Sequence, residues 1–205
     1  MMRIRPLILC ALVTCQGLAD LHAQALVPDL VDVAYGADPA QKLDVYLAQA
    51  AAPTPALIEI HGGGWSGGVK SDFHWYLWDA NNVGIVEKVL AQGVSILSIH
   101  YRLVTNTGSQ ILNPFPTGNL DVVRAIQFAR ANAAAWNIDP ERIGVLGRSA
   151  GGHLGLWAAL SDDFADPTSP DPVSRESSRP IALVSCWTPT DLTPQIGLLC
   201  SVNRL

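Results

Sequence analysis

Residues 143–151 read Ile-Gly-Val-Leu-Gly-Arg-Ser-Ala-Gly, an apolar run that passes directly into the pattern Gly-x-Ser-x-Gly. The apolar part predicts a short buried strand, and the residues after the serine predict a helix. Gly147 and Gly151 lack a Cβ atom, so the strand and the helix can approach each other closely. A serine on such a sharp turn stands at the helix N-terminus, where the helix dipole favours negative charge. The pattern therefore predicts that Ser149 is a nucleophile.

A second glycine-rich segment, His61-Gly62-Gly63-Gly64-Trp65, directly follows another strand-like run. Consecutive glycines increase the entropic cost of folding, but they allow the backbone N–H groups to approach a ligand closely. Acyl transfer passes through an oxyanion that needs fixed hydrogen-bond donors. We expect the N–H groups of Gly63, Gly64 and Ala150 to form that oxyanion hole. The ring of His61 is expected to brace the loop by hydrogen bonding, the alternative being a catalytic base.

The rest of the chain alternates strand-like and helical patterns, which predicts an α/β fold with a mostly parallel sheet flanked by helices. The run 42–47 alternates apolar and polar residues, as a half-buried edge strand does. We expect residues 137–142 to link a helix to the next strand through a turn at Asp139, and Asn119 to cap a helix. The expected strands are 31–35, 42–47, 56–60, 94–99, 143–146 and 181–186, the expected helices are 83–92, 120–136 and 151–160, and residues 162–179 form a surface loop.

The composition is that of a globular domain, since 49% of the 205 residues are hydrophobic and 15% are charged. The formal net charge is −5 and no basic stripe is present, which argues against a nucleic-acid partner. No Cys/His spacing has the form of a metal site, and no cofactor is expected. Cys186 and Cys200 could pair in an oxidising compartment, or remain two unrelated thiols.

The N-terminus reads as a secretory signal peptide over residues 1–25. Arg3 and Arg5 supply the positive region, residues 7–13 the apolar region, and residues 23–25 (Ala-Gln-Ala) the cleavage site. The apolar stretch is too short for a stable membrane span, although an uncleaved anchor is the alternative. We therefore expect a secreted or periplasmic protein whose mature domain covers residues 26–205, beginning near Leu26.

Taken together, these motifs resemble the bacterial esterases of the hormone-sensitive-lipase and feruloyl-esterase-like (BD-FAE-like) group. The resemblance rests on the HGGGW segment at 61–65, Tyr101-Arg102-Leu103, the helix containing Asp121, and residues 137–154 (NIDPERIGVLGRSAGGHL). It covers roughly residues 31–192. It implies an α/β-hydrolase fold, hydrolysis of small carboxylic esters without a cofactor, Ser149 as the nucleophile, and structural roles for Arg102 and Asp121.

The remainder of a serine triad is not evident. In this fold the acid and the histidine follow the serine, but the only histidine after Ser149 is His153, expected on the helix flank away from the substrate. His74 and His100 precede the serine, so a role for either would need a rearranged triad. Asp191 is read as a loop or capping residue, the alternative being that it orients a base. The family continues with two further strands, the acid and the histidine. We therefore expect a domain incomplete at its C-terminus, with residues 181–186 as an exposed apolar edge and with little or no esterase activity.

Two alternatives remain open at this point: a catalytically dead hydrolase fold used for binding, and a related serine amidase or exopeptidase. The substrate is also open. Aromatic residues cluster after the triple glycine and could line an acyl or aryl pocket or could pack on themselves as a cap segment. They are Trp65, Phe73, Trp75, Tyr76 and Trp78.

Overall fold

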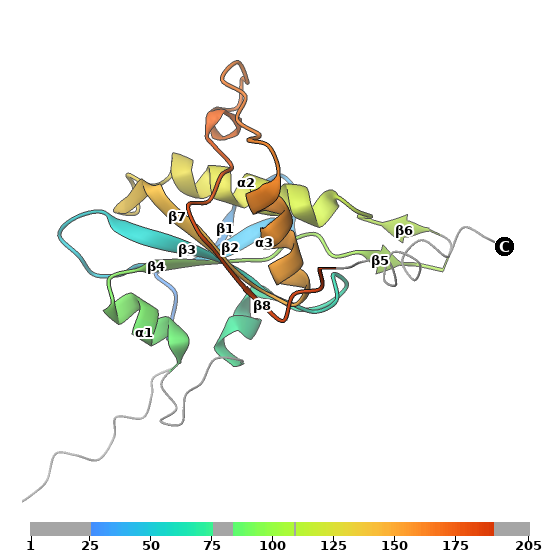
Figure 1. Cartoon of the computed structure of the whole chain (residues 1–205), viewed down its shortest axis with the longest axis horizontal. Helices are drawn as coiled ribbons and strands as arrows, with labels where there is room; N and C mark the ends of the chain where they lie inside the picture. The colour runs from blue at the N-terminus through green and yellow to red at the C-terminus, as the bar shows by residue number, and fades with distance from the viewer. Residues whose placement is uncertain (1–25, 76–83, 109, 191–205) are drawn as a thin grey trace, which may run out of the picture.

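A six-stranded mixed sheet forms the centre of the protein, with its strands in the order β1-β2-β4-β3-β7-β8 (Figure 1). The computed structural model describes residues 26–75, 84–108 and 110–190. β3, β4, β7 and β8 run parallel, whereas β2 is antiparallel to both of its neighbours, β1 and β4. The strands of this sheet are β1 (Leu30–Ala34), β2 (Lys42–Tyr46), β3 (Thr54–Ile60), β4 (Ser95–Ile99), β7 (Ile138–Arg148) and β8 (Leu183–Cys186).

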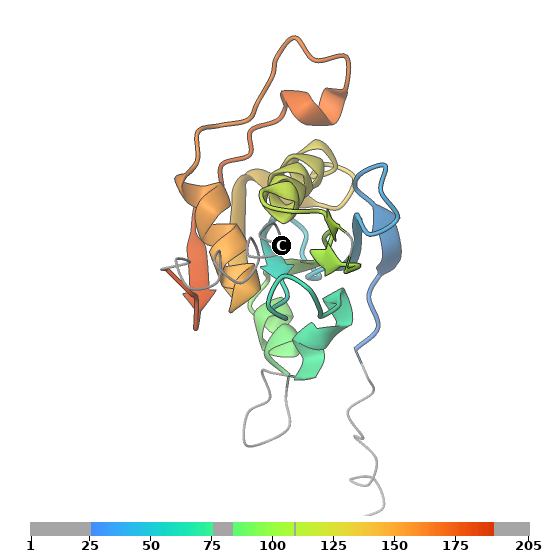
Figure 2. The same ribbon diagram turned by 90° about the vertical axis from the view of Figure 1, so that its right-hand side faces the viewer.

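Helices cover both faces of the sheet (Figure 2). One face carries α2 (Thr117–Ala131) and α3 (Ala150–Leu160). The opposite face carries α1 (Ile85–Ala91) and the short 3₁₀ helix η1 (Lys70–Trp75). A small hairpin of β5 (Thr105–Asn106) and β6 (Ile111–Leu112) and a second 3₁₀ helix, η2 (Pro172–Arg175), complete the described elements. This layering is the α/β architecture that the sequence predicts.

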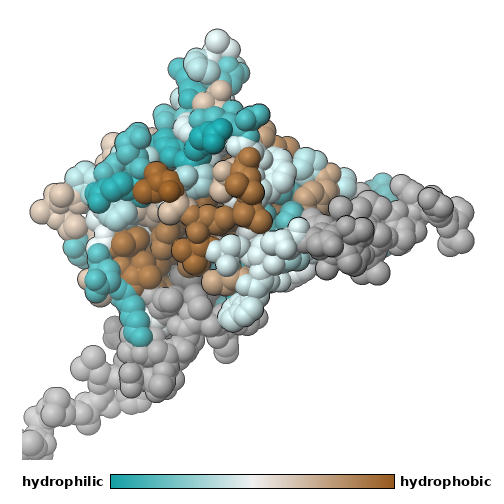
Figure 3. Space-filling view, in the orientation of Figure 1, coloured by the Kyte–Doolittle hydropathy of each residue, from teal (hydrophilic) through white to brown (hydrophobic). Residues whose placement is uncertain are grey.

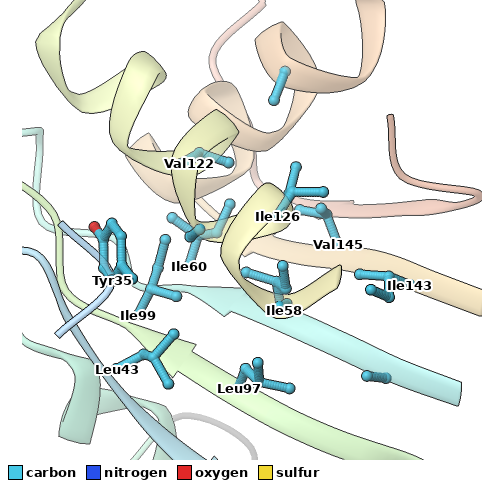
Figure 4. Packing of buried hydrophobic residues seen from close by; sticks show 14 of the residues in the cluster. Tyr35, Leu43, Ile58, Ile60, Leu97, Ile99, Val122, Ile126, Ile143 and Val145 are labelled. Carbon is cyan, nitrogen blue, oxygen red and sulfur yellow. The ribbon is translucent and has the colours of Figure 1, made fainter. Parts of the chain in front are cut away.

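The main hydrophobic core lies between the sheet and α2 and α3 (Figure 4). Ile58 and Ile60 of β3 point toward Val122 and Ile126 of α2, and all four side chains are completely buried. Because side chains alternate along a strand, the residues between them face the other side of the sheet. There Tyr46, Val86 and Ile96 form a second, smaller apolar cluster with α1. Glu59 shares this second face, because it alternates with Ile58 and Ile60 along β3.

The outer edge of the sheet at β8 exposes apolar side chains to solvent. Val184 on this strand is 50% exposed, and Ile181 and Trp187 beside it are 63% and 78% exposed. Leu160 at the end of α3 is 77% exposed. Figure 3 shows apolar surface on the face where β8 crosses the front of the molecule. The expectation of an exposed apolar edge in this region is confirmed, although the strand begins at Leu183.

Three sequence-based expectations about local structure are wrong. The run 42–47 is not an edge strand, because β2 lies between β1 and β4 and four of its five residues are buried. Its polar residue Asp44 is buried because Lys70 of η1 forms an ion pair with it at 2.6 Å. Residues 137–142 are not a simple link, because β7 already begins at Ile138, and the predicted turn at Asp139 is an irregularity within this strand. Asn119 does not cap α2, since the helix begins earlier, at Thr117.

Candidate active site

Ser149 lies at the junction between β7 and α3, where the chain turns sharply. Its backbone has φ 51° and ψ −120°, outside the left-handed helical region that a non-glycine residue tolerates best. Such a conformation costs on the order of 1–3 kcal/mol and persists only when the surroundings enforce it. Here the Ser149 N–H donates a 2.9 Å hydrogen bond to the carbonyl of Cys186, and the Ser149 carbonyl accepts one from His153 N–H. The turn leaves the Ser149 side chain half-buried at the helix N-terminus.

Close backbone packing fixes this turn. A Cβ atom on Gly147 would lie 2.4 Å from the carbonyl oxygen of Gly151. A Cβ atom on Gly151 would lie 2.1 Å from the carbonyl oxygen of Ile60 and 2.4 Å from that of His61. All three distances are far shorter than real Cβ contacts, and the neighbouring atoms belong to backbone that cannot rotate away. The two glycines of the Gly-x-Ser-x-Gly pattern are therefore required for α3 to approach the ends of β7 and β3.

The triple-glycine segment lies directly beside Ser149. A Cβ atom on Gly62 would be 3.3 Å from Ser149 Cβ. Gly63 and Gly64 have φ values of 117° and 59°, conformations that favour glycine, and Gly67 N–H closes the loop on the Gly63 carbonyl at 3.0 Å. Among the described residues, no acceptor takes a hydrogen bond from the Gly63 or Gly64 N–H groups. The first N–H groups of α3, that of Ala150 included, likewise have no partner within their helix.

The only histidine that follows Ser149 in the chain, His153, packs one turn into α3 against aromatic side chains. Its ring centroid lies 5.5 Å from that of Trp65 and 5.2 Å from that of Phe115. The ring thus contacts Trp65 of the glycine-rich segment, and the expectation that it points away from the substrate side stays a prediction. Its Nδ1 is buried without a hydrogen-bond partner in the described structure, and burial lowers the pKa of His153. Within residues 26–75, 84–108 and 110–190, no side chain forms a hydrogen bond with the Ser149 hydroxyl.

His61 braces the glycine loop. Its Nδ1 lies 2.7 Å from the Gly62 carbonyl, which can only accept, so Nδ1 carries the proton. Its Nε2 lies 3.0 Å from His100 Nδ1 and is therefore the acceptor in that pair. Burial lowers the pKa of His61 to about 4, which agrees with a neutral ring. Because both ring nitrogens are engaged, this histidine is not placed to act as a base for Ser149. The sequence offered no signal that His100 would be its partner.

Arg102 and Asp121 anchor the loop after β4 to α2. The Asp121 carboxylate is fully buried and accepts hydrogen bonds from the Arg102 backbone N–H, from Arg102 Nε at 3.0 Å and from Nη2 at 2.5 Å. Gln41 Nε2 donates a further hydrogen bond of 2.8 Å. The contacts agree with the structural roles expected for this pair.

Several predicted features lie outside the described residues. They include the signal segment 1–25, Tyr76 and Trp78, the side chains of Phe73, His74 and Trp75, and Asp191 and Cys200. A pairing of Cys186 with Cys200 therefore stays a prediction. Across the described segments, no group of three or more His, Cys, Asp or Glu side chains is arranged to hold a metal ion. In the same segments, no helix is long and apolar enough to cross a membrane.

The BD-FAE family model matches residues 43–197 of this chain, a range that contains Ser149 and the triple-glycine segment. The chain belongs to the BD-FAE family. Among curated proteins it is 37% identical over 131 residues to esterase LipC of Mycobacterium tuberculosis, covering 63% of this chain and 29% of that protein. It is 33% identical over 140 residues to carboxylesterase NlhH of the same species, covering 67% of this chain and 35% of that protein. This BD-FAE chain thus spans about a third of the length of these relatives.

Solved structures show the same architecture. An acetyl ester-xyloside bifunctional hydrolase from Caldicellulosiruptor lactoaceticus superposes with a TM-score of 0.62 at 29% identity, covering 84% of this chain and 53% of that one. A truncated carbohydrate esterase from gut microbiota superposes with a TM-score of 0.61 at 26% identity, covering 80% and 57% respectively. The BD-FAE chain therefore has the α/β-hydrolase fold, and its similar proteins are esterases.

Proposed function

We propose that this BD-FAE chain hydrolyses small carboxylic esters with Ser149 as the nucleophile. The observation that carries the proposal is the juxtaposition of the strained Ser149 turn with the triple-glycine segment, whose N–H groups have no acceptor in the described structure. The esterase names of its curated relatives support the same reaction class. The proposed oxyanion hole consists of the N–H groups of Gly63, Gly64 and Ala150.

In the proposed reaction, Ser149 Oγ attacks the carbonyl carbon of the ester. The carbonyl oxygen becomes an oxyanion that accepts hydrogen bonds from the three backbone N–H groups. The intermediate then collapses, the alkoxide leaves with the proton lost by the serine, and the acyl group remains on Oγ. Water releases the acid in a second step of the same kind. Both steps need a base to take a proton from the serine or the water.

The described residues place no base within hydrogen-bond distance of Ser149, so we propose that the 205-residue chain reacts slowly. Loss of the triad base can reduce turnover by about a million-fold, while an oxyanion hole retains part of the catalysis. Deacylation should be slowed in the same way as acylation, because it depends on the same kind of proton transfer. With an activated ester such as p-nitrophenyl acetate, whose good leaving group makes acylation the faster step, an acyl-enzyme on Ser149 should accumulate.

Chemical rescue tests the proposal. Purified protein and the Ser149→Ala variant are assayed with p-nitrophenyl acetate, with and without added imidazole as a diffusible base. We expect imidazole to increase nitrophenol release by the wild-type protein above the reaction of imidazole alone, and to give no such increase with Ser149→Ala. Equal release by both proteins at every imidazole concentration would contradict a nucleophilic role for Ser149 and would favour the alternative of a hydrolase fold used for binding.

We also propose that residues 1–25 are removed on export to the periplasm or the medium, on the sequence pattern alone. Expression of the full chain in a secreting bacterial host, followed by N-terminal sequencing of the exported protein, tests this. A new N-terminus near Leu26 is expected, and protein retained inside the cell with residues 1–25 intact would contradict it.

A further inference from the structure

A buried polar row crosses the sheet beneath the segment that follows the triple glycine. Asp44, Ser98 and Glu59 lie side by side on β2, β4 and β3, because the strand register pairs Ser98 with both other residues. Their exposed fractions are 5%, 1% and 5%. Polar groups this deeply buried need hydrogen-bond partners, and buried charges need opposite charges. The Asp44 carboxylate has such a charge in Lys70 Nζ at 2.6 Å. The Glu59 carboxyl instead forms its hydrogen bond with the neutral hydroxyl of Ser98.

The protons in this row can be assigned by counting donors. The Ser98 hydroxyl lies 2.6 Å from Glu59 Oε2 and 2.7 Å from the backbone carbonyl oxygen of Lys70. A serine hydroxyl has one proton, and a backbone carbonyl can only accept. Both contacts are fully satisfied when Ser98 donates to the Lys70 carbonyl and accepts from Glu59, which requires a proton on the Glu59 carboxyl. An ionised Glu59 would leave two acceptors competing for a single proton at short distances.

The surroundings of Glu59 agree with this assignment. Burial raises the pKa of Glu59 to about 8, even though a hydrogen bond donated by Ser98 and the positive charge of Arg148 would each lower it. The negative charge of Asp72 in η1 raises the pKa further. Charged or titratable groups reach this region from each neighbouring element: Tyr46 on β2, Lys70 and Asp72 on η1, Tyr101 after β4, Arg148 on β7 and, acting on Tyr46, Glu87 on α1.

The Lys70 carbonyl lies at the end of the glycine-rich loop. Gly67 N–H is bonded to the Gly63 carbonyl, and a Cβ atom on Gly68 would lie 2.4 Å from the Gly62 carbonyl oxygen, so the loop folds tightly back on itself. His61 braces the beginning of this loop, and the hydroxyl of Ser98 holds its end through Lys70. A change at Ser98 should therefore be transmitted to the glycine-rich loop beside Ser149.

We propose that Glu59 is a positioning residue that keeps its proton at neutral pH and, through Ser98 and the Lys70 carbonyl, holds the glycine loop in place. The catalytic meaning of this support rests on the proposed function, but the protonation and the loop anchoring do not. The expected consequence is a specific pH dependence. Unfolded Glu59 is ionised above its ordinary pKa of 4.5, whereas the folded protein keeps the proton up to about pH 8, so unfolding between these values releases one proton.

Denaturant unfolding at several pH values between 5 and 8 measures this proton release. The proteins compared are wild type, Glu59→Gln and the surface control Glu141→Gln. The contribution of Glu59 to stability is present at low pH and is lost as the pH rises through about 8. Relative to Glu59→Gln, the wild-type unfolding constant should rise about tenfold per pH unit across this window and level off above it. Glu141→Gln should follow the wild type. Parallel curves for wild type and Glu59→Gln would overturn the proposal.

Two measurements keep the test decisive if Glu59→Gln does not fold. The infrared spectrum of folded wild-type protein at pH 7 should contain the carbonyl band of a protonated carboxylic acid, which disappears as the pH passes 8. Hydrogen exchange in the peptide covering residues 61–70, corrected for the intrinsic effect of pH, should accelerate over the same interval, and in Ser98→Ala it should be fast at all pH values. Absence of the infrared band at pH 7, or equal exchange in wild type and Ser98→Ala, would refute the assignment. Neither readout uses ester turnover, so their failure is distinguishable from failure of the proposed function.

Discussion

Replacement of Gly151 by alanine introduces a methyl group where backbone atoms already meet. The new Cβ would lie 2.1 Å from the Ile60 carbonyl oxygen, and real Cβ contacts stay above 3.0 Å, so α3 must move by at least 0.9 Å (3.0 minus 2.1). Overpacking of this kind typically costs 1–3 kcal/mol, and we expect about 3 kcal/mol because the opposing carbonyls of Ile60 and His61 are both backbone. For a chain of this length, that corresponds to a melting temperature lower by about 6–12 °C.

The same displacement moves Ser149 relative to the glycine loop. A misplacement of about 1 Å can reduce a reaction rate about a hundredfold, so the imidazole-dependent release of nitrophenol should fall by roughly this factor in Gly151→Ala. Gly67→Ala is the matched control within the same site, because its Cβ would lie 3.6 Å from the Gly63 carbonyl oxygen, an ordinary contact. Differential scanning fluorimetry and the rescue assay are then compared for both variants. Equal melting temperatures and rates in Gly151→Ala and Gly67→Ala would refute the close-packing argument.

Asp121→Ala should destabilise the protein by about 3 kcal/mol in denaturant unfolding, because it removes a fully buried carboxylate that holds Arg102. The control Asp139→Ala, which removes an exposed ion pair, should change stability little. Equal effects of the two substitutions would contradict the anchoring role of Asp121. Val184→Lys on the exposed edge strand should raise the concentration at which the protein aggregates in light scattering and leave its melting temperature nearly unchanged, and a large drop in melting temperature would show that this side chain is packed. Because the pKa of His61 is lowered to about 4, the unfolded state binds a proton on this ring at higher pH than the folded state does. The stability of wild type relative to His61→Gln should therefore fall as the pH drops from 6.5 to about 4. A stability difference between the two proteins that does not change with pH would argue against a neutral ring.

The sequence predicted the turn at Ser149 and the glycine loop because local chemistry determines both. An apolar strand ending in glycine leaves few conformations for the next residues, and the positive φ values of Gly63 and Gly64 are those that only glycine adopts easily. The parallel pairing of β3 with β7 then follows from the alternation of strands and helices.

The errors arose where contacts distant in sequence decide the outcome. Asp44 reads as a solvent-facing residue of an edge strand, but an ion pair with Lys70, 26 residues away, allows its burial. Asp139 reads as a turn residue, and its side chain does accept a hydrogen bond from Glu141 N–H, but it lies within β7, which pairs with β3 on both sides of this irregularity. The protonated Glu59 is likewise invisible in the sequence, because its state depends on Ser98 of the neighbouring strand.

The proposed ester hydrolysis depends on Ser149 accepting an acyl group beside the glycine loop. Incubation with p-nitrophenyl acetate and imidazole, acid quenching and peptide mass mapping test this most directly. The account predicts an acetyl group on the peptide containing Ser149, absent from Ser149→Ala and strongly reduced in Gly151→Ala. Acetylation found only on other side chains, in equal amounts in wild type and Ser149→Ala, would contradict it.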